Sequence, residues 1–355
     1  MEQQKKILFL GETYRADAIT WINGLKEFGH FDIITWELKT PSNGFRNRIG
    51  RILEFALALS SIKKQIRQEK PHMVIAERTT SYGFLAALTG IDVIVIAQQG
   101  RTDLWPESSV LYPLKKAIQR YAFKKATMIH AWGPVMTISM KASGVDMKKM
   151  MVLPKGINLN QFTMATNQNQ DIISAIVTRS LSAEYRHNII LKAFGTLHQQ
   201  GIDFTLTIVG TGSEMENLKS LAADLHIAKK VHFTGRISNI HLPALLQQSN
   251  FYLSMPITEG VSASLFEAMA SGCYPIVSDL PGNQSWIRHR ENGQLVSIDD
   301  YNALASEIIW ANDNPEIRKK AVSENRQFIE QHVDYHTNMA IIANKYHQLI
   351  NGHVL

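Results

Sequence analysis

The residues whose spacing points most directly to chemistry lie in the segment PITEGVSASLFEAMASGCYPIVSD, residues 256–279. Glu259 and Glu267 are separated by seven residues, with a glycine and small side chains between them. The segment follows the strand-like run FYLS and opens a predicted helix near Ala263. Small residues at a helix N-terminus expose backbone N–H groups and the positive end of the helix dipole to an anion. The pattern favours a diphosphate site with two carboxylates at its rim, the alternative being an ordinary helix N-terminus with nearby acidic residues.

Such a segment must be positioned by the strands around it. Apolar runs of strand length recur along the first half of the chain, and longer stretches with apolar residues at helical spacing separate them. The same alternation restarts after the polar stretch 160–171. The predicted strands cover residues 7–10, 32–36, 72–76, 93–97 and 128–131, and then 172–178, 204–209, 231–234, 251–254 and 274–278.

Strands that alternate with helices imply a parallel sheet covered on both faces. Two such series predict two doubly wound α/β domains joined by a linker near residues 156–171. After about residue 300 the strand signals stop, and the remaining sequence is typical of three helices. Ligands of such sheets bind beside the carboxyl ends of the strands, so the loops after the strands are where functional residues are expected.

Composition restricts the class of protein. The chain has 355 residues, 45% of them hydrophobic and 19% charged, which fits a globular protein of about two domains. Cys273 is the single cysteine, which excludes a disulfide framework or a cysteine-cluster zinc site and fits a reducing compartment. No uninterrupted apolar run reaches the ~18 residues that a membrane-spanning helix needs. The N-terminal residues are not typical of a leader peptide, and we expect a cytoplasmic protein.

Charge is distributed unevenly between the two halves. Residues 1–158 carry a net charge of +10, and residues 159–355 carry −4. The basic residues gather in segments 44–70 and 113–126, among them Arg46, Arg48, Arg51, Lys63, Lys64, Arg67, Lys115, Lys116, Arg120, Lys124 and Lys125. Basic amphipathic helices can lie on anionic lipid, so peripheral membrane contact is predicted, with a solvated charged surface as the alternative. Nucleic acid is not an expected partner, because no interleaved aromatic platform accompanies the charge.

With these residues in view, the segment 256–279 resembles the E-x(7)-E signature of the retaining glycosyltransferases of family four. Other pieces that resemble the family occur in the expected order, and the combined spacing is more specific than any single piece. They are residues 151–158 with Phe162, the pair Thr178–Arg179, residues 190–194, residues 204–212 with a Gly-x-Gly turn, and residues 231–236.

The resemblance implies the GT-B architecture, in which two Rossmann-like domains of doubly wound parallel sheet flank a cleft and a C-terminal helix crosses back. Residues 1–158 are then the acceptor domain, with residues 335–355 packing on it. Residues 159–334 are the nucleotide-sugar donor domain.

The resemblance also implies roles for single residues. Arg179 would neutralise the diphosphate leaving group, Glu259 would orient the transferred sugar, and Glu267 would bind the ribose hydroxyls. Backbone amides of Gly260, Val261, Ser262, Ala263, Ser264 and Leu265 would hold the distal phosphate or the sugar, and the backbone at Arg236 and Ile237 would meet the base. Gly210, like Gly212, is expected to permit a tight turn rather than to touch the nucleotide.

The sequence departs from the family at three places. Where a lysine–glycine pair is expected after Arg179, the sequence has Tyr185–Arg186; Arg186 either restores the charge or is a solvated arginine. Gln99 occupies the place of a histidine and can donate a hydrogen bond but cannot act as an acid or base at neutral pH. The first loop has one glycine, Gly11, instead of a pair.

Two loop carboxylates, Glu12 and Asp103, are candidate acceptor contacts, the alternative being ordinary loop residues. No DxD-like pair follows a suitable strand, since Asp299 and Asp300 precede a helix and are typical of a cap. We therefore expect no metal and no cofactor, only a UDP- or GDP-linked sugar as co-substrate.

The function that this resemblance implies is retaining transfer of a hexose or N-acetylhexosamine to a glycan or lipid-linked acceptor, during synthesis of lipopolysaccharide O-antigen, capsule or exopolysaccharide. The expected location is the cytoplasm, with possible contact to the inner face of the membrane. Two alternatives stay open: a nucleotide-sugar 2-epimerase of similar fold, and a catalytically silent subunit that binds a sugar nucleotide.

Overall fold

The computed structural model describes residues 4–39, 45–98, 100, 104, 107–164 and 172–352, with the backbone alone at 45–49, 51 and 52. The chain divides into two compact units. Met1–Lys155 and His336–Leu355 form the first, and Gly156–Tyr335 form the second. The sequence expectation placed these divisions at 158/159 and 334/335, and the contacts within each unit place them at 155/156 and 335/336.

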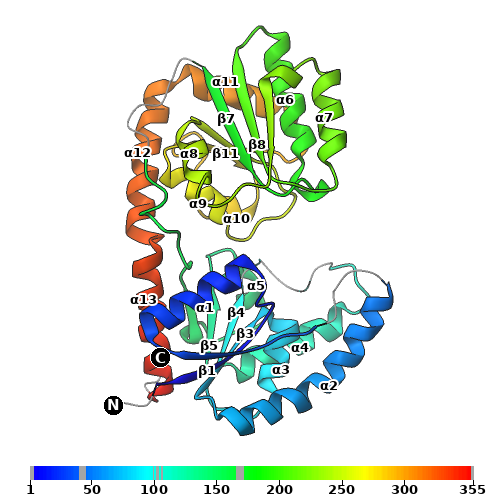
Figure 1. Ribbon diagram of the computed structural model, residues 1–355, viewed down its shortest axis with the longest axis vertical. Helices are drawn as coiled ribbons and strands as arrows, with labels where there is room; N and C mark the ends of the chain where they lie inside the picture. The colour runs from blue at the N-terminus through cyan, green and yellow to red at the C-terminus, as the bar shows by residue number, and fades with distance from the viewer. Residues whose placement is uncertain are drawn as a thin grey trace. The chain divides into compact units, whose positions relative to one another are not determined.

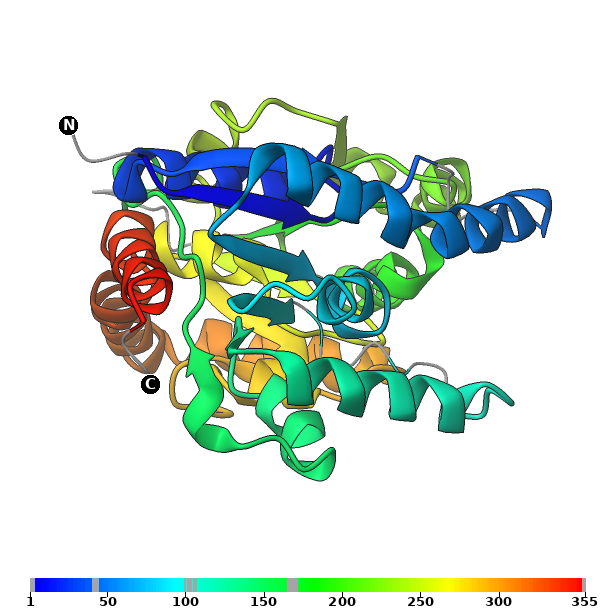
Figure 2. The same ribbon diagram turned by 90° about the horizontal axis from the view of Figure 1, so that it is seen from below.

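The first unit is built on a six-stranded parallel sheet of order β2-β1-β3-β4-β5-β6. Helices α2, α3 and α4 cover one face of this sheet, and α1 and α13 cover the other (Figures 1 and 2). The strands are β1 (Lys6–Leu10), β2 (Asp32–Trp36), β3 (Met73–Glu77), β4 (Ile94–Gln98), β5 (Met128–Ala131) and β6 (Met150–Val152), and the helices are α1 (Ala16–Gly29), α2 (Phe45–Glu69), α3 (Phe84–Ala87), α4 (Tyr112–Lys125), α5 (Met136–Ala142) and α13 (Tyr335–Ile350).

The last helix, α13, joins this unit through buried contacts. The Tyr346 hydroxyl lies 3.2 Å from His130 Nδ1, and His347 Nε2 lies 2.8 Å from the carbonyl oxygen of Gly29. The ring of His347 also stacks on that of Phe31, with 4.2 Å between ring centroids. These contacts bury the apolar face of a helix that is remote in sequence, which stabilises its return to the first sheet.

The second unit has its own six-stranded parallel sheet, of order β12-β11-β10-β7-β8-β9. One hydrophobic core joins the sheet to α6, α7 and α11, and a second joins its other face to α8, α9 and α12. The strands are β7 (Ile173–Thr178), β8 (Phe204–Val209), β9 (Val231–Gly235), β10 (Phe251–Ser254), β11 (Tyr274–Ser278) and β12 (Gln294–Val296), and the helices are α6 (His187–Gln199), α7 (Met215–Asp224), α8 (Leu242–Gln247), α9 (Ala263–Ala270), α10 (Pro281–Gln284), α11 (Tyr301–Asp313) and α12 (Pro315–His332).

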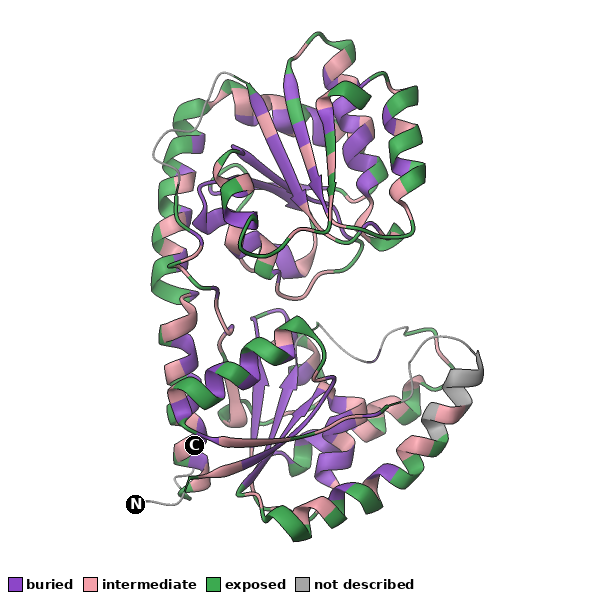
Figure 3. Ribbon diagram, in the orientation of Figure 1, coloured by how far each residue is buried: buried purple, intermediate pink, exposed green. Residues whose placement is uncertain are grey.

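Burial follows the layers that the sequence predicts. The strands β3, β4, β10 and β11 are buried along their whole length, and helices beside them alternate buried and exposed faces (Figure 3). Continuous apolar strands are typical of parallel sheets, because helices shield both faces from water. The prediction of two parallel α/β sheets is therefore confirmed.

Two strands were not predicted. β6 and β12 are three residues long and pair at the outer edge of their sheets. Three residues are too few to show a periodic pattern, and edge strands have only one neighbour to shield them. Residues 165–171 of the predicted linker lie outside the described residues. Ile157, near the start of that linker, forms a bridge to Asp334.

Candidate active site

Each sheet has a point where the strand order reverses. In the second sheet the first strand, β7, lies between β8 and β10, and in the first sheet β1 lies between β2 and β3. The connections on either side of such a point leave in opposite directions, so the loops separate and a crevice opens at the carboxyl ends of the strands. In each unit, candidate residues among those that the structure describes lie near the place where the strand order reverses.

In the second unit the crevice is lined by Arg179, which directly follows β7. Its Nη2 donates to a carboxylate oxygen of Glu259 and, over 2.6 Å, to Oγ of Ser262. Its Nε lies 3.3 Å from Oγ of Ser254, at the end of β10. Arg179 and Glu259 have side chains only 14% and 12% exposed, so the pair is screened little by water. The fold thus brings together two predicted residues that are 80 positions apart in sequence.

The N-terminus of α9 points into the same crevice. Ser262 is its N-cap, and the Ser262 Oγ accepts the backbone N–H of Leu265 over 3.2 Å. The backbone N–H of Gly260 donates to Glu259 Oε1 over 3.1 Å. A Cβ on Gly282, in α10, would lie 2.3 Å from the carbonyl oxygen of Glu259, so only glycine allows the two loops to approach so closely. The predicted segment Gly260–Leu265 therefore forms a helix start packed against Arg179.

Glu267 lies on the second turn of α9 and is half-buried. Burial raises the pKa of Glu267 to about 7, against the opposing influence of the Arg179 cation. A carboxyl group with this pKa exists in both protonation states near neutrality, so it can accept or donate a hydrogen bond. Both capacities suit a hydroxyl-bearing ligand.

The pKa of Arg179 is raised, because nearby Tyr252 and Glu259 outweigh the effect of its burial. The guanidinium therefore remains charged throughout the physiological pH range. A permanent buried cation beside a helix N-terminus creates a positive field in which an oxyanion is stabilised.

The Gly-x-Gly turn after β8 packs beneath Arg179. Gly210 has φ of +146°, and a Cβ there would lie 2.2 Å from the carbonyl oxygen of Arg179. A Cβ on Gly212 would lie 2.2 Å from the carbonyl oxygen of Leu181. The two glycines thus allow two backbone segments to touch, as the sequence analysis expected of a tight turn.

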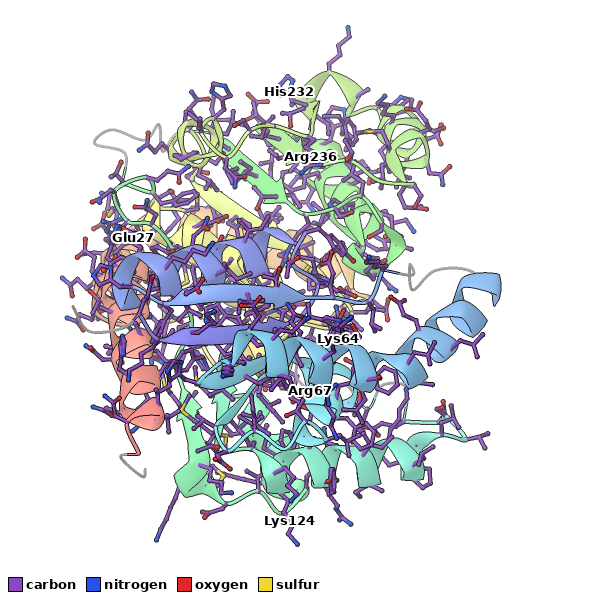
Figure 4. The ribbon with its side chains drawn as sticks, turned by 60° about the horizontal axis from the view of Figure 1, so that its bottom comes forward. Glu27, Lys64, Arg67, Lys124, His232 and Arg236 are labelled. Carbon is purple, nitrogen blue, oxygen red and sulfur yellow. The ribbon has the colours of Figure 1, made fainter. Side chains whose placement is uncertain are left out.

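Arg236 and Ile237 follow β9, the edge strand of the second sheet. The Arg236 side chain is exposed. Figure 4 labels Arg236 together with His232, which lies in β9. The place of Arg236 and Ile237 after the carboxyl end of β9 agrees with a role at the rim of the site. Among the described residues, neither of the two contacts Arg179 directly.

Arg186, one position after the place of the missing lysine, precedes α6 and forms an ion pair. Its backbone is left-handed, with φ of +53°, and its guanidinium pairs with Asp299. Instead, Tyr185 lies next to Arg179, with 5.3 Å between the guanidinium carbon and the ring centroid. Asp299 is thus an ion-pair partner as well as a loop residue, whereas Asp300 caps α11 through a 2.8 Å bond from the N–H of Ala303.

The first unit places Gly11 and Glu12 at its own switch point. Glu12 is buried and accepts hydrogen bonds from Arg78, at 2.8 Å, and from Arg15, at 3.2 Å. The Glu12 N–H donates to Glu77 Oε2 over 3.1 Å. A Cβ on Gly11 would lie 2.5 Å from the same Glu77 oxygen. The candidate acceptor residue Glu12 is therefore part of a charged cluster rather than a solvated loop carboxylate.

Sequence reasoning missed three charged members of that cluster. Burial raises the pKa of Glu77 to about 7 and lowers that of Lys155 to about 8, and Arg78 has φ of +62°, a strained backbone for a residue with a side chain. The signal was present, because a buried strand ends in Glu77–Arg78 beside the switch point, but only charged residues after β1 and β4 were considered.

Two predicted residues, Gln99 and Asp103, lie outside the described residues, as do the side chains of Arg46, Arg48 and Arg51. Among the side chains that the structure describes, no three His, Cys, Asp or Glu residues gather as a metal site requires. Within the same residues, no helix is both long and apolar enough to span a membrane.

Comparison with known proteins identifies the family. Residues 162–328 match the family described as Glycosyl transferases group 1. An uncharacterised glycosyltransferase of Haemophilus influenzae is 32% identical over 145 residues, which cover 40% of this chain and 40% of that protein. The UDP-Gal:alpha-D-GlcNAc-diphosphoundecaprenol alpha-1,3-galactosyltransferase of Escherichia coli is 23% identical over 280 residues, covering 72% of this chain and 70% of that protein.

Solved structures agree on the fold. The sucrose-phosphate synthase of Thermosynechococcus elongatus superposes with a TM-score of 0.80 at 15% identity, covering 98% of this chain and 100% of that chain. Anabaena HepE, solved in complex with UDP and glucose, gives a TM-score of 0.75 at 15% identity, covering 97% and 100% of the two chains. These likenesses confirm the GT-B fold. The match over residues 162–328, just under half of the chain, confirms the predicted resemblance to glycosyltransferases in that part of the sequence.

Proposed function

We propose that this protein transfers a hexose or N-acetylhexosamine from a nucleotide-diphosphate sugar to a glycan or lipid-linked acceptor, with retention of anomeric configuration. The observation that carries the proposal is the convergence of Arg179, Glu259 and the N-terminus of α9 at the switch point of the second sheet. This arrangement gives a buried positive field and a carboxylate within one crevice, as transfer from a diphosphate requires.

The reacting bond joins the sugar to the diphosphate. As it breaks, negative charge grows on the departing phosphate, and positive charge grows on the sugar. Arg179 and the backbone N–H groups that begin α9 are positioned to stabilise the phosphate, and because they are fixed in advance, little reorganisation accompanies the reaction. The Glu259 carboxylate is positioned to accept hydrogen bonds from sugar hydroxyls, and in the free protein it holds Arg179 in place.

Donor selection is proposed to lie around Glu267, Arg236 and Ile237. The Glu267 carboxyl would bind the ribose hydroxyls, and the backbone after β9 would contact the base. A UDP-linked sugar is our proposed donor, since HepE was solved with UDP and the E. coli relative is named for UDP-galactose. The latter relative is also named for a lipid diphosphate acceptor, which supports a lipid-linked acceptor here.

The acceptor is proposed to bind in the first unit, at the cluster of Glu12, Glu77 and Arg78. Surface-polysaccharide synthesis is the proposed setting, because relatives named for colanic acid and amylovoran biosynthesis match 48% and 47% of this chain. No metal is required in this proposal, because the Arg179 cation and the α9 amides supply the positive charge that a divalent ion would otherwise provide.

The test is a calorimetric screen of UDP-, GDP- and ADP-sugars, followed by product analysis with the donor that binds. Arg179→Gln should weaken donor binding by about 10–100-fold, since a charge-assisted hydrogen bond contributes about 1.5–3 kcal/mol. Arg288→Gln, which changes an exposed arginine of the same unit, should leave the affinity unchanged. Turnover should survive chelation of divalent ions.

Product analysis by NMR separates the proposed reaction from its alternatives. Transfer with retention supports the proposal, and inversion refutes the stereochemical part. Epimerised free sugar would identify an epimerase, and donor binding without any bond cleavage would identify a silent subunit. Activity that is lost with chelator and restored by magnesium would contradict the role given to Arg179.

A further inference from the structure

His187, the first residue of α6, is buried in a way that its sequence position does not suggest. Histidine is seldom fully buried, yet this residue is only 2% exposed. Both of its ring nitrogens are buried without a hydrogen-bond partner. Leaving a buried polar group unpaired costs about 1–3 kcal/mol, so such a group in a folded protein calls for an explanation.

A cavity of about 330 Å³ adjoins this histidine. It lies between the first turns of α6 and α7, and its polar lining comes from Ser182, Arg186, His187, Asn188 and Glu214. No side chain caps the α6 N-terminus, which begins at the left-handed Arg186. The Arg186 Nε is also buried without a partner, although its Nη2 pairs with Asp299. Unpaired donors, a helix N-terminus and a cavity therefore coincide.

The electrostatic surroundings favour an anion. Burial and the nearby Arg179 cation lower the pKa of His187 to about 4. Burial is the larger cause of this shift, and the Arg179 cation is the second; the positive charge of Arg179 also attracts an oxyanion. The charged and titratable groups around His187 are Arg179 after β7, Tyr185 and Arg186 before α6, and Glu214 before α7. Glu214, the one carboxylate named in the described lining, opposes the anion from the far rim.

We propose that His187, Arg186 Nε and the α6 N-terminus bind a phosphate oxyanion in this cavity, and that His187 is a positioning residue for the diphosphate of the donor. The role in donor binding rests on the function proposed above. Tyr185 links the two places, since its ring lies 5.3 Å from the Arg179 guanidinium and 6.5 Å from the His187 ring. His187 would then replace the lysine that the sequence lacks, with an imidazole in place of an ammonium group.

The test follows the imidazole of His187 by NMR in protein labelled with ¹⁵N-histidine, using inorganic pyrophosphate and UDP as separate probes. If an oxyanion binds, the His187 signals shift, and the imidazole titrates at least one pH unit higher than in the free protein, because the anion stabilises its protonated form. Signals that move with neither probe overturn the proposal.

A pair of variants supplies an independent measurement. His187→Phe keeps a ring in the space and removes both nitrogens, and it should weaken UDP binding about tenfold, the equivalent of about 1.4 kcal/mol. His198→Phe, on the same helix, should change nothing. Unchanged UDP affinity in His187→Phe also overturns the proposal. If His187→Phe does not fold, the NMR measurement on the unaltered protein tests the proposal.

The two probes distinguish this inference from the proposed function. If UDP binds and neither UDP nor pyrophosphate moves His187, the inference fails and the proposed function stands. If pyrophosphate moves His187 while no nucleotide binds, the oxyanion site stands and the proposed function fails. A response to pyrophosphate alone in a protein that does bind UDP assigns the cavity to free phosphate and rejects the positioning role.

Discussion

At the scale of single residues, the two candidate crevices each contain a carboxyl group whose ionisation is disfavoured by burial. Burial raises the pKa of Glu77 in the first unit and of Glu267 in the second to about 7. In the folded protein both groups therefore hold a proton at a pH where the unfolded chain has lost it. Such residues are common in functional sites, where a fixed environment is needed more than stability.

The stability that Glu77 and Glu267 contribute should consequently fall as pH rises from about 4.5 to about 7. Buried His130 and His187 contribute in the opposite direction, because burial lowers their pKa to about 4. A folded pKa above the unfolded value means that the folded state binds more protons in this window, so raising the pH favours unfolding. Glu77→Gln should remove a loss of about 2 kcal/mol between pH 5 and 7.5, because the folded and unfolded states differ in protonation of this group mainly between its unfolded pKa of 4.5 and its folded pKa of about 7.

Urea unfolding at pH 5 and pH 7.5 measures this loss in the unaltered protein and in the variant. Glu267→Gln should act in the same direction, and Glu330→Gln, at an exposed position of α12, serves as the control. A Glu77→Gln variant whose unfolding free energy changes with pH as it does in the unaltered protein would show that Glu77 is ionised throughout.

At the scale of elements, the site depends on how closely neighbouring loops approach. The loop that carries Glu259 and the short helix α10 touch through backbone atoms alone at Gly282. Because Glu259 contacts Arg179, a displacement of this loop would disturb the pair. Gly282 is thus a positioning residue for the site although it has no side chain.

Gly282→Ala should therefore impair donor binding without preventing folding. The added Cβ would lie 2.3 Å from the carbonyl oxygen of Glu259, and overpacking of this kind costs about 1–3 kcal/mol. Since displacement of a loop by ~1 Å can lower activity about 100-fold, kcat/KM should fall by 10–100-fold. Gln284→Ala, an exposed change in the same helix, should be neutral. Equal kcat/KM values for the two variants would show that the loop adapts.

At the scale of the whole molecule, charge and apolar exposure coincide on the first unit. Leu53 and Leu57 of α2 are 62% and 72% exposed, and Leu114 of α4 is 58% exposed. The same two helices carry exposed basic residues, among them Lys64 and Arg67 of α2 and Lys124 of α4 (Figure 4). Exposed leucines beside basic residues favour shallow binding to an anionic bilayer, which would bring the protein to a lipid-linked acceptor.

Sedimentation with vesicles of phosphatidylglycerol and phosphatidylcholine tests this surface. The protein should bind, and binding should weaken with salt. Replacing Lys64, Arg67 and Lys124 by glutamine should lower the partition coefficient by about 100-fold, at ~1 kcal/mol for each residue. The matched control replaces Lys219, Lys319 and Lys320 in the second unit. Equal losses in both triple variants would show that only net charge matters.

The sequence by itself determined the two parallel sheets, because buried strands and amphipathic helices carry strong local patterns. It also indicated candidate segments for the chemistry, since the E-x(7)-E spacing and a glycine at a helix start are local features. The match over residues 162–328 confirmed the family that these features indicated. The predicted strands at 32–36, 128–131, 204–209, 251–254 and 274–278 have the bounds that the structure shows.

Only the tertiary structure decided what each side chain contacts. The pairing of Arg179 with Glu259, the Glu12–Glu77–Arg78 cluster and the pairing of Arg186 with Asp299 join residues far apart in sequence. Burial of His187 likewise depends on α7 and the loop before α6. Such contacts and the pKa values that follow from them depend on strand order and packing, which a one-dimensional pattern of hydrophobicity does not contain.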